Sequence, residues 1–176
     1  MKNTSDKKTT LKIAILITLS ISWLSPNIVF AEESVNKLEV AFSLPKLDVD
    51  PYHRPYVAVW VETLERKPVA TLAVWHEKDT WLKDLRQWWR KIGRRGDGNL
   101  DEVTGATRKP GQYVVAWNGV DSKGNLVAPG EYLLNIESVR EEGGRSYSRE
   151  KINIGTNATI EIAPDLELGK VIIKTF

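Results

Sequence analysis

The chain has 176 residues, of which 41% are hydrophobic and 27% are charged, a length and balance typical of one globular domain. It contains no cysteine, which excludes disulfides, thiol catalysis and cysteine-bound zinc or iron–sulfur clusters. The single apolar run, near the N-terminus, is incompatible with a polytopic membrane protein.

The first 31 residues have the pattern of a secretory signal peptide. Four lysines precede or begin an apolar stretch that ends at Leu24 and is too short to cross a bilayer, which takes about 20 residues. Val29 and Ala31 stand at the small-residue positions of a signal-peptidase site before Glu32. We therefore expect a signal peptide over residues 1–31, one domain over 32–176 and a periplasmic location without stable membrane insertion. The alternative is an uncleaved N-terminal anchor.

Cleavage at that site changes the charge of the protein. The segment carries four lysines and one acid, Asp6, so its loss turns the formal net charge from +2 to −1. A nucleic-acid partner then lacks its electrostatic support, and we expect none.

The rest of the chain reads mainly as short β-strands separated by turns. Leu38, Val40, Phe42 and Leu44 alternate with polar or small residues, as in a half-buried strand. About eight such segments, one of them a polar edge strand near 147–154, predict a β-sandwich. Their approximate ranges are 38–44, 56–64, 69–75, 112–117, 132–139, 147–154, 158–162 and 171–173.

One segment departs from this pattern and predicts an amphipathic α-helix over Asp79–Ile92. Its apolar residues form one wide helical stripe, with Asp79 as the expected N-cap and Gly93 as the expected C′ residue. The simplest interpretation is packing against the sandwich. The alternative is that Trp88 or Trp89 offers a stacking surface to a planar ligand. The stripe consists of Trp81, Leu82, Leu85, Trp88, Trp89 and Ile92.

A long segment without periodicity, from Gly93 to Gly111, follows the expected helix. Loops of this length inside a small domain are often functional. This one contains Asp101-Glu-Val-Thr-Gly-Ala-Thr107, which has the form D-x-x-T-G-A-T. That form resembles the target motif of bacterial extracytoplasmic flavin transferases, which join FMN to a hydroxyl of the protein.

The resemblance implies that Thr107 is the acceptor of a covalent FMN, with Thr104 the next candidate. Such a hydroxyl is expected to be exposed to the transferase, and Gly105 and Ala106 would leave room for it. Arg108 could pair with the phosphodiester. The alternative is a plain turn in which the threonine hydroxyls bond to nearby backbone. The residues expected at the cofactor site are Asp101, Thr104, Gly105, Ala106, Thr107, Arg108, Trp88 and Trp89.

A second resemblance covers nearly all of the chain after the signal peptide. Spaced tryptophans and glycines carry it, from Arg54–Trp60 and Thr71–Trp75 through Thr104–Gly111 to Trp117–Asp121 and Gly130–Tyr132. They resemble the predicted periplasmic proteins of domain of unknown function 2271. Members of that family often occur beside flavin transferases and PepSY-type membrane reductases, which implies an extracytoplasmic, flavin-based electron-transfer system.

The region from Trp117 to Tyr132 also resembles the immunoglobulin-like repeat of flagellar hook-cap proteins. We interpret it as a hairpin in which Trp117 ends one strand facing the core and Pro129-Gly130 opens the next. The expected fold is thus mainly β, an immunoglobulin-like antiparallel β-sandwich with one inserted amphipathic α-helix.

Residue patterns typical of enzymes are sparse. His53 and His76 are the only histidines, and they share no metal-ligand spacing. Two functions are therefore open. One is a periplasmic electron carrier with FMN on Thr107, installed by a flavin transferase and serving a PepSY-type reductase. The other is a cofactor-free interaction module of the cell envelope.

Overall fold

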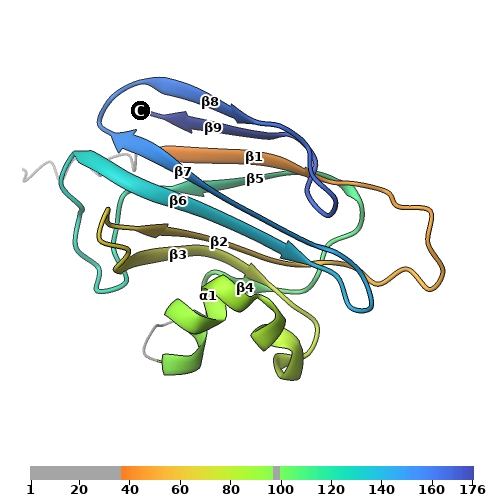
Figure 1. Ribbon diagram of the computed structural model, residues 1–176. Helices are drawn as coiled ribbons and strands as arrows, with labels where there is room; N and C mark the ends of the chain where they lie inside the picture. The colour runs from red at the N-terminus through yellow and green to blue at the C-terminus, as the bar shows by residue number, and fades with distance from the viewer. Residues whose placement is uncertain (1–36, 97–99) are drawn as a thin grey trace, which may run out of the picture. The chain divides into compact units, whose positions relative to one another are not determined.

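Alternating apolar residues build the first of two sheets. The computed structural model describes residues 37–96 and 100–176 (Figure 1). Strand β1 (Leu38–Leu44) pairs with β5 (Gly111–Trp117) on one side and with β9 (Val171–Thr175) on the other. Strand β8 (Ala158–Ile162) completes an antiparallel sheet of order β5-β1-β9-β8. Every second side chain of β1 is buried, as its period of two predicts.

The second sheet has five strands in the order β4-β3-β2-β6-β7. Its central strand β2 (Tyr56–Glu62) is buried at every position, because both of its faces are covered. Strands β3 (Pro68–Trp75), β2, β6 (Gly130–Val139) and β7 (Arg145–Ile154) pair antiparallel in that order, whereas the two-residue β4 (Thr104–Gly105) runs parallel to β3.

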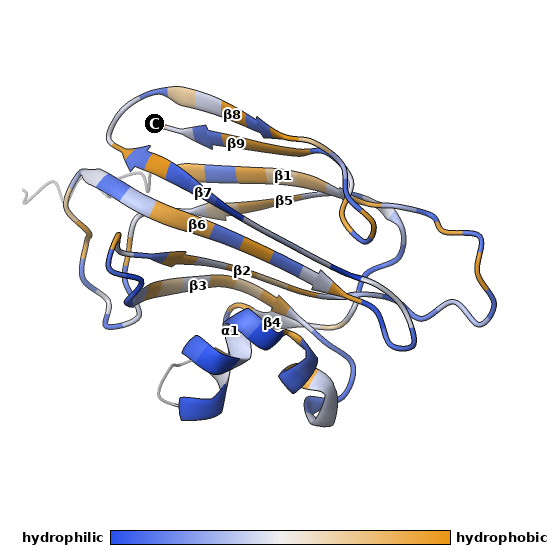
Figure 2. Ribbon diagram, in the orientation of Figure 1, coloured by the Kyte–Doolittle hydropathy of each residue, from blue (hydrophilic) through white to orange (hydrophobic). Residues whose placement is uncertain are grey.

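The two sheets enclose the larger of two apolar cores. Inward-facing residues of β1, β5 and β9 meet those of β2, β3, β6 and β7 there. Hydrophobic positions in Figure 2 alternate with polar ones along the outer strands, and they are denser on β2 and β3. This arrangement confirms the predicted mainly β, sandwich-like fold.

The predicted helix is shorter and more interrupted than the apolar stripe suggested. A 3₁₀ turn (Asp79–Asp84), α1 (Arg86–Lys91) and a second 3₁₀ turn (Gly93–Arg95) replace one continuous helix. The break occurs at Leu85, whose backbone leaves the helical region so that its side chain becomes fully buried. The N-cap assignment to Asp79 is wrong, since Lys78 holds that position and caps nothing with its side chain.

A second, smaller core lies between these helical turns and the outer face of the five-stranded sheet. Trp60 and Val74 of the sheet contact Leu85 and Trp88, and Trp89 packs at the margin. Gly93 is needed for this packing, because a Cβ there would lie 2.6 Å from the Trp88 ring and 2.5 Å from the Trp89 ring. Gly93 does hold the predicted C′ position, directly after the C-cap Ile92, but without a positive φ, so packing rather than backbone conformation requires glycine there.

The connections show which turns were predicted correctly. The β2–β3 hairpin turns through Thr63–Lys67. Strand β7 is an edge strand, as predicted. The hairpin proposed between β5 and β6 is wrong, because these strands belong to different sheets. Only a single bridge, Val120 to Leu126, forms within that connection. Trp117 does end β5 facing the core, with 7% of its surface exposed.

The expected signal peptide, residues 1–31, lies outside the described residues. Over residues 37–96 and 100–176, no helix is long and apolar enough to cross a membrane.

Candidate functional site

The flavin-motif segment is part of the five-stranded sheet and not a free loop. Thr104 and Gly105 form β4 against the end of β3 (Figure 1). The N–H of Val74 donates to the carbonyl of Val103 at 2.8 Å, and the N–H of His76 donates to that of Gly105 at 2.9 Å. The motif is therefore anchored at its centre, on the sheet edge opposite β7.

Thr107 is buried, with 7% of its surface exposed. The expectation that this residue presents an exposed hydroxyl is wrong for the described conformation. The β4–β3 pairing holds the segment against the sheet up to Gly105, two residues before Thr107. Thr104 and Ala106, by contrast, are exposed.

The Thr107 hydroxyl is not used in a local turn. Between described residues, no hydrogen bond involves the side chain of Thr107 or of Thr104. The plain-turn interpretation required such bonds to nearby backbone. Asp101, at the start of the motif, is exposed and has a polar partner of its own.

Aromatic residues at the end of the sandwich contact the segment that follows β4. The guanidinium of Arg108 lies 5.1 Å from the centre of the Trp75 ring, a cation–π distance. Trp75 meets Tyr113 edge to face, with 5.2 Å between ring centres. The Tyr113 hydroxyl donates to the Lys109 carbonyl at 2.6 Å. Arg108 and Lys109 are thereby placed directly after Thr107, where a phosphodiester would find positive charge.

The two tryptophans expected to stack on a flavin have different environments. Trp88 is 1% exposed, and its indole N–H donates to the Thr71 hydroxyl at 3.3 Å. It therefore packs in the smaller core and offers no face to a ligand. Trp89 is half-buried, with its ring centre 6.5 Å from that of Trp88.

Sequence reasoning missed a buried carboxylate beneath α1. Glu137 is 0% exposed. It accepts hydrogen bonds from the backbone N–H groups of Gln87 and Trp88, both at 3.0 Å, and from Arg145 Nε at 2.7 Å. A glutamate in a strand of alternating residues is expected to face solvent. The only feature of the sequence that could have indicated its burial is the apolar helical segment that covers it.

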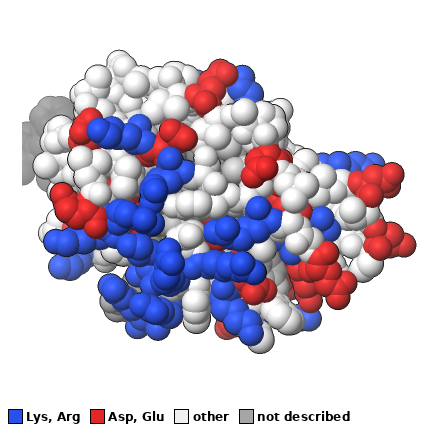
Figure 3. Space-filling view, in the orientation of Figure 1, with Lys and Arg blue, Asp and Glu red and all other residues white. Residues whose placement is uncertain are grey.

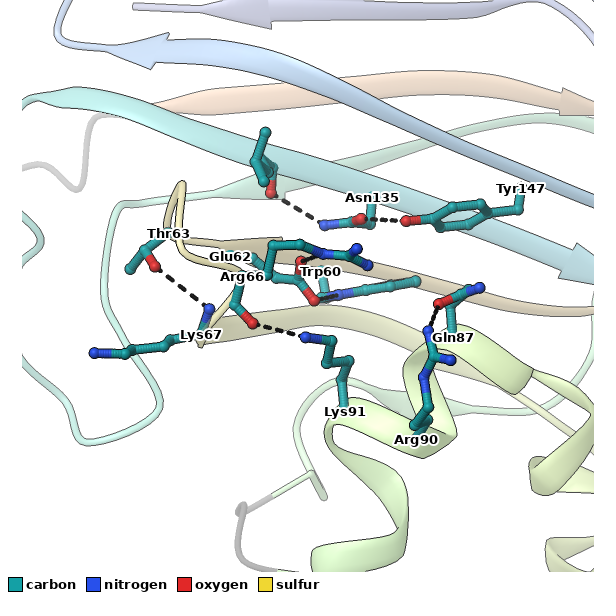
Figure 4. A network of polar contacts seen from close by, with 11 residues as sticks. Trp60, Glu62, Thr63, Arg66, Lys67, Gln87, Arg90, Lys91, Asn135 and Tyr147 are labelled. Carbon is teal, nitrogen blue, oxygen red and sulfur yellow. Dashed lines mark hydrogen bonds and ion pairs between the residues drawn. The ribbon is translucent and has the colours of Figure 1, made fainter.

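A second buried carboxylate, Glu62, belongs to a polar network beside α1 (Figure 4). Glu62 Oε1 accepts the indole N–H of Trp60 at 3.0 Å, and Arg66 Nε lies 3.7 Å from its Oε2. Alongside, the Tyr147 hydroxyl donates to Asn135 Oδ1 at 2.8 Å. Burial is the largest effect on Tyr147 and raises its pKa above the ordinary tyrosine value.

A third carboxylate, Glu167, is also almost fully buried and connects a loop to the β6–β7 turn. It pairs with Arg140 at 3.0 Å and accepts the N–H of Gly144 at 2.7 Å. Its own N–H donates to the Ser146 hydroxyl at 2.8 Å. With these bonds satisfied, Glu167 acts as a structural group.

The histidines lie apart, each near one acid. His53 Nδ1 is 4.0 Å from Glu141, and His76 Nδ1 is 3.4 Å from Asp79. In the part of the chain that the structure describes, no three His, Asp or Glu side chains are grouped so that they could hold a metal ion.

Comparison with known proteins identifies the family. The family model DUF2271, described as "Predicted periplasmic protein", matches residues 37–170. The chain belongs to the DUF2271 family. The match extends from the residue before β1 to the residue before β9, and so includes the motif, the smaller core, the polar network and all of the larger core except Val171 and Ile173 of this DUF2271 protein. No curated protein and no solved structure matches the chain.

Proposed function

We propose that this DUF2271 protein is exported by its signal peptide and carries FMN, esterified to Thr107, in an extracytoplasmic electron-transfer system. The family description supports the compartment. The D-x-x-T-G-A-T motif supports the modification. The flavin would supply the redox chemistry, while the protein binds and orients it.

One structural observation carries the proposal: the Thr107 hydroxyl has no hydrogen-bond partner among the described residues, although Thr107 is 7% exposed. A fully buried hydroxyl without a partner would cost about 1–3 kcal/mol, but the Thr107 oxygen is not among the buried unpartnered polar atoms of the described residues, so it keeps some contact with solvent. A hydroxyl free of local bonds keeps its oxygen available as a nucleophile. Arg108 and Lys109 follow it with two positive charges.

Transfer requires Thr107 to become accessible, and the structure shows which contacts must break. The segment after β4 is held by the contact of Arg108 with Trp75 and by the hydrogen bond of Tyr113 to Lys109. Neither contact belongs to a strand pair, so both can open while β4 stays on β3. Once the ester has formed, Arg108 is free to turn from the Trp75 ring to the phosphodiester.

The transfer step conserves atoms and charge. The Thr107 oxygen attacks the flavin-side phosphorus of a flavin dinucleotide, the pyrophosphate bond breaks and adenylate leaves. The hydroxyl proton passes to a base of the transferase. The partners of this carrier are then the flavin transferase that loads it and a PepSY-type membrane reductase that supplies its electrons.

The test is the intact mass of the protein purified from a host periplasm, with and without a co-expressed flavin transferase. We expect a gain of one FMN less one water that maps to Thr107. Thr107→Ala should abolish this gain, and the matched variant Thr104→Ala should retain it. Gain retained in Thr107→Ala would move the acceptor to another residue.

An unmodified mass in every sample would overturn the flavin assignment. In that case the alternative, a cofactor-free interaction module of the cell envelope, becomes the better description. The presence of covalent flavin can also be checked by visible absorbance of the denatured protein, which keeps the flavin only if it is covalently bound.

A further inference from the structure

Strand β7 has one open side. In the five-stranded sheet it lies at the edge, and among the described strands β6 is its only partner there. A loop residue, Glu167, covers the start of β7 through its bond to Ser146. From Tyr147 to Ile154, the described backbone pairs with β6 alone. An extended segment can add to such an edge through main-chain hydrogen bonds.

The outward face of β7 is strongly basic. Arg145, Arg149 and Lys151 alternate with residues that point into the sandwich, and Tyr147 stands between the two arginines. Arg66 of the β2–β3 turn and Arg90 and Lys91 of α1 add further positive charge. In Figure 3 the side chains of Lys and Arg form a band over the face built by β6, β7 and α1.

Few exposed acids of the protein compete with a partner for the cations of this face. The carboxylates of Glu62 and Glu137 are 1% and 0% exposed and already bond to groups of the protein. Glu131 pairs with Lys151 at 3.2 Å, and both side chains are about half exposed. Arg149 is exposed, and within the described part of the chain it has no ion-pair partner.

Two arginines of this face already pair with carboxylates of the protein, Arg145 with Glu137 at 2.7 Å and Arg66 with Glu62 at 3.7 Å. Arg145 Nη2 and Arg66 Nε are buried, and neither has a hydrogen-bond partner among the described residues. Because these nitrogens are buried, they offer nothing to a partner, whereas the exposed guanidinium of Arg149 can bind a carboxylate in planar, paired geometry.

We propose that β7 and the basic face beside it bind an extended acidic segment of a partner protein. The segment would add to the sheet along Tyr147–Ile154. Alternate side chains on a strand are about 6.5–7 Å apart, so acids at every second position of the segment would face Arg149 and Lys151 in turn. This proposal does not depend on the flavin at Thr107, which belongs to the opposite edge of the sheet.

The chemistry of the face favours a protein segment over a membrane surface. Membrane-binding faces combine cations with exposed large apolar side chains. In the described chain, exposed large apolar residues do not occur on β6, β7 or α1, and the β2–β3 turn that carries Arg66 has one, Leu64. The exposed large apolar residues of the described chain are Val49, Leu64, Val114, Leu126, Leu166 and Phe176.

The test uses two labelled peptides of equal composition. One repeats Thr-Glu four times, and the other has four threonines followed by four glutamates. Fluorescence anisotropy with the full protein should show that the alternating peptide binds at least about tenfold more tightly, because only it aligns its acids with β7. Its binding should protect the amides of residues 147–154 from hydrogen exchange.

Two variants distinguish binding at the basic face from non-specific attraction between an acidic peptide and any cation of the protein. Arg149→Glu should weaken binding of the alternating peptide by about tenfold. Lys123→Glu, the same charge change in an exposed turn, should leave it unchanged. Equal affinity for the two peptides, equal effects of the two variants, or binding to phosphatidylglycerol vesicles but to neither peptide would overturn the proposal.

Discussion

Buried carboxylates determine how the helical segment is attached to the sheet. Glu137 is fully buried on β6, yet it accepts two backbone N–H groups at the start of α1 and the side chain of Arg145. A helix of six residues has little stability of its own. Its place on the sheet therefore depends on this carboxylate together with the packing of Leu85 and Trp88.

Replacement of Glu137 by alanine should lower the free energy of unfolding by about 3–5 kcal/mol. The loss removes the acceptor of two N–H groups and leaves the Arg145 cation without its buried partner. Urea denaturation followed by circular dichroism measures the change. Glu131→Ala, which breaks the exposed pair with Lys151, should cost less than about 1 kcal/mol. Equal losses in the two variants would contradict this role of Glu137.

For single residues, the sequence identified the candidate site residues, but it did not predict which of them are buried. The motif Asp101–Thr107 was visible, but the burial of Thr107 depends on β4, which is only two residues long. The packing role of Trp88 followed from helical spacing. The burial of Glu62 and Glu137 could not be predicted, because it depends on α1 and the turn beside it covering one face of the sheet.

At the level of elements, turns with unusual backbone angles define the hairpins. Glu142 in the β6–β7 turn has φ +54°, a conformation that costs a non-glycine residue about 1–2 kcal/mol. Its side chain is exposed. The residue thus contributes strain to the turn that joins the two longest strands of the structure.

Glu142→Gly should raise the free energy of unfolding by about 0.5–1 kcal/mol. Relief of the left-handed strain outweighs the greater entropy that glycine gives the unfolded chain. The neighbouring variant Glu141→Gly is the control, since position 141 does not have a positive φ and should be destabilised or unchanged. A thermal melt of both variants decides the matter, and a lower midpoint for Glu142→Gly would count against it.

Strands were predicted correctly where the apolar residues alternate clearly. The prediction failed at a turn that could join strands of the same sheet or of different sheets. Alternation located β1, β8 and β9 within a few residues. The connection from Trp117 to Gly130 contains a tight turn in which Asp121 accepts the N–H groups of Lys123 and Asn125 at 2.9 Å. Such a turn resembles a hairpin in sequence, but it serves here within a crossing between the two sheets.

At the scale of the whole molecule, three tyrosines make the free energy of unfolding depend on pH in the alkaline range. Burial is the largest effect on Tyr52, Tyr56 and Tyr147, and it raises the pKa of each above the ordinary value of about 10. They come from the loop before β2, from β2 itself and from β7. Their titration therefore reports on separate parts of the five-stranded sheet and of the loop that leads into it.

The free energy of unfolding should fall as the pH rises above about 10. In that range the unfolded chain has already lost these phenolic protons, whereas the folded chain still holds them. The folded state therefore binds more protons, and its stability decreases with pH until the raised pKa values are passed. Below the ordinary tyrosine pKa both states are protonated, and this contribution to stability is fully present.

Tyr147→Phe tests how much one tyrosine contributes to the pH dependence of stability. The variant should lose about 1 kcal/mol at neutral pH, because the hydrogen bond to Asn135 is gone. Above about pH 10 its stability should fall less steeply than that of the unsubstituted protein, since one proton fewer distinguishes the folded from the unfolded state. Urea denaturation at a series of pH values gives both quantities. An unchanged slope would show that Tyr147 does not hold its proton more tightly in the fold, and would remove the evidence that this ring is shielded beside Trp60.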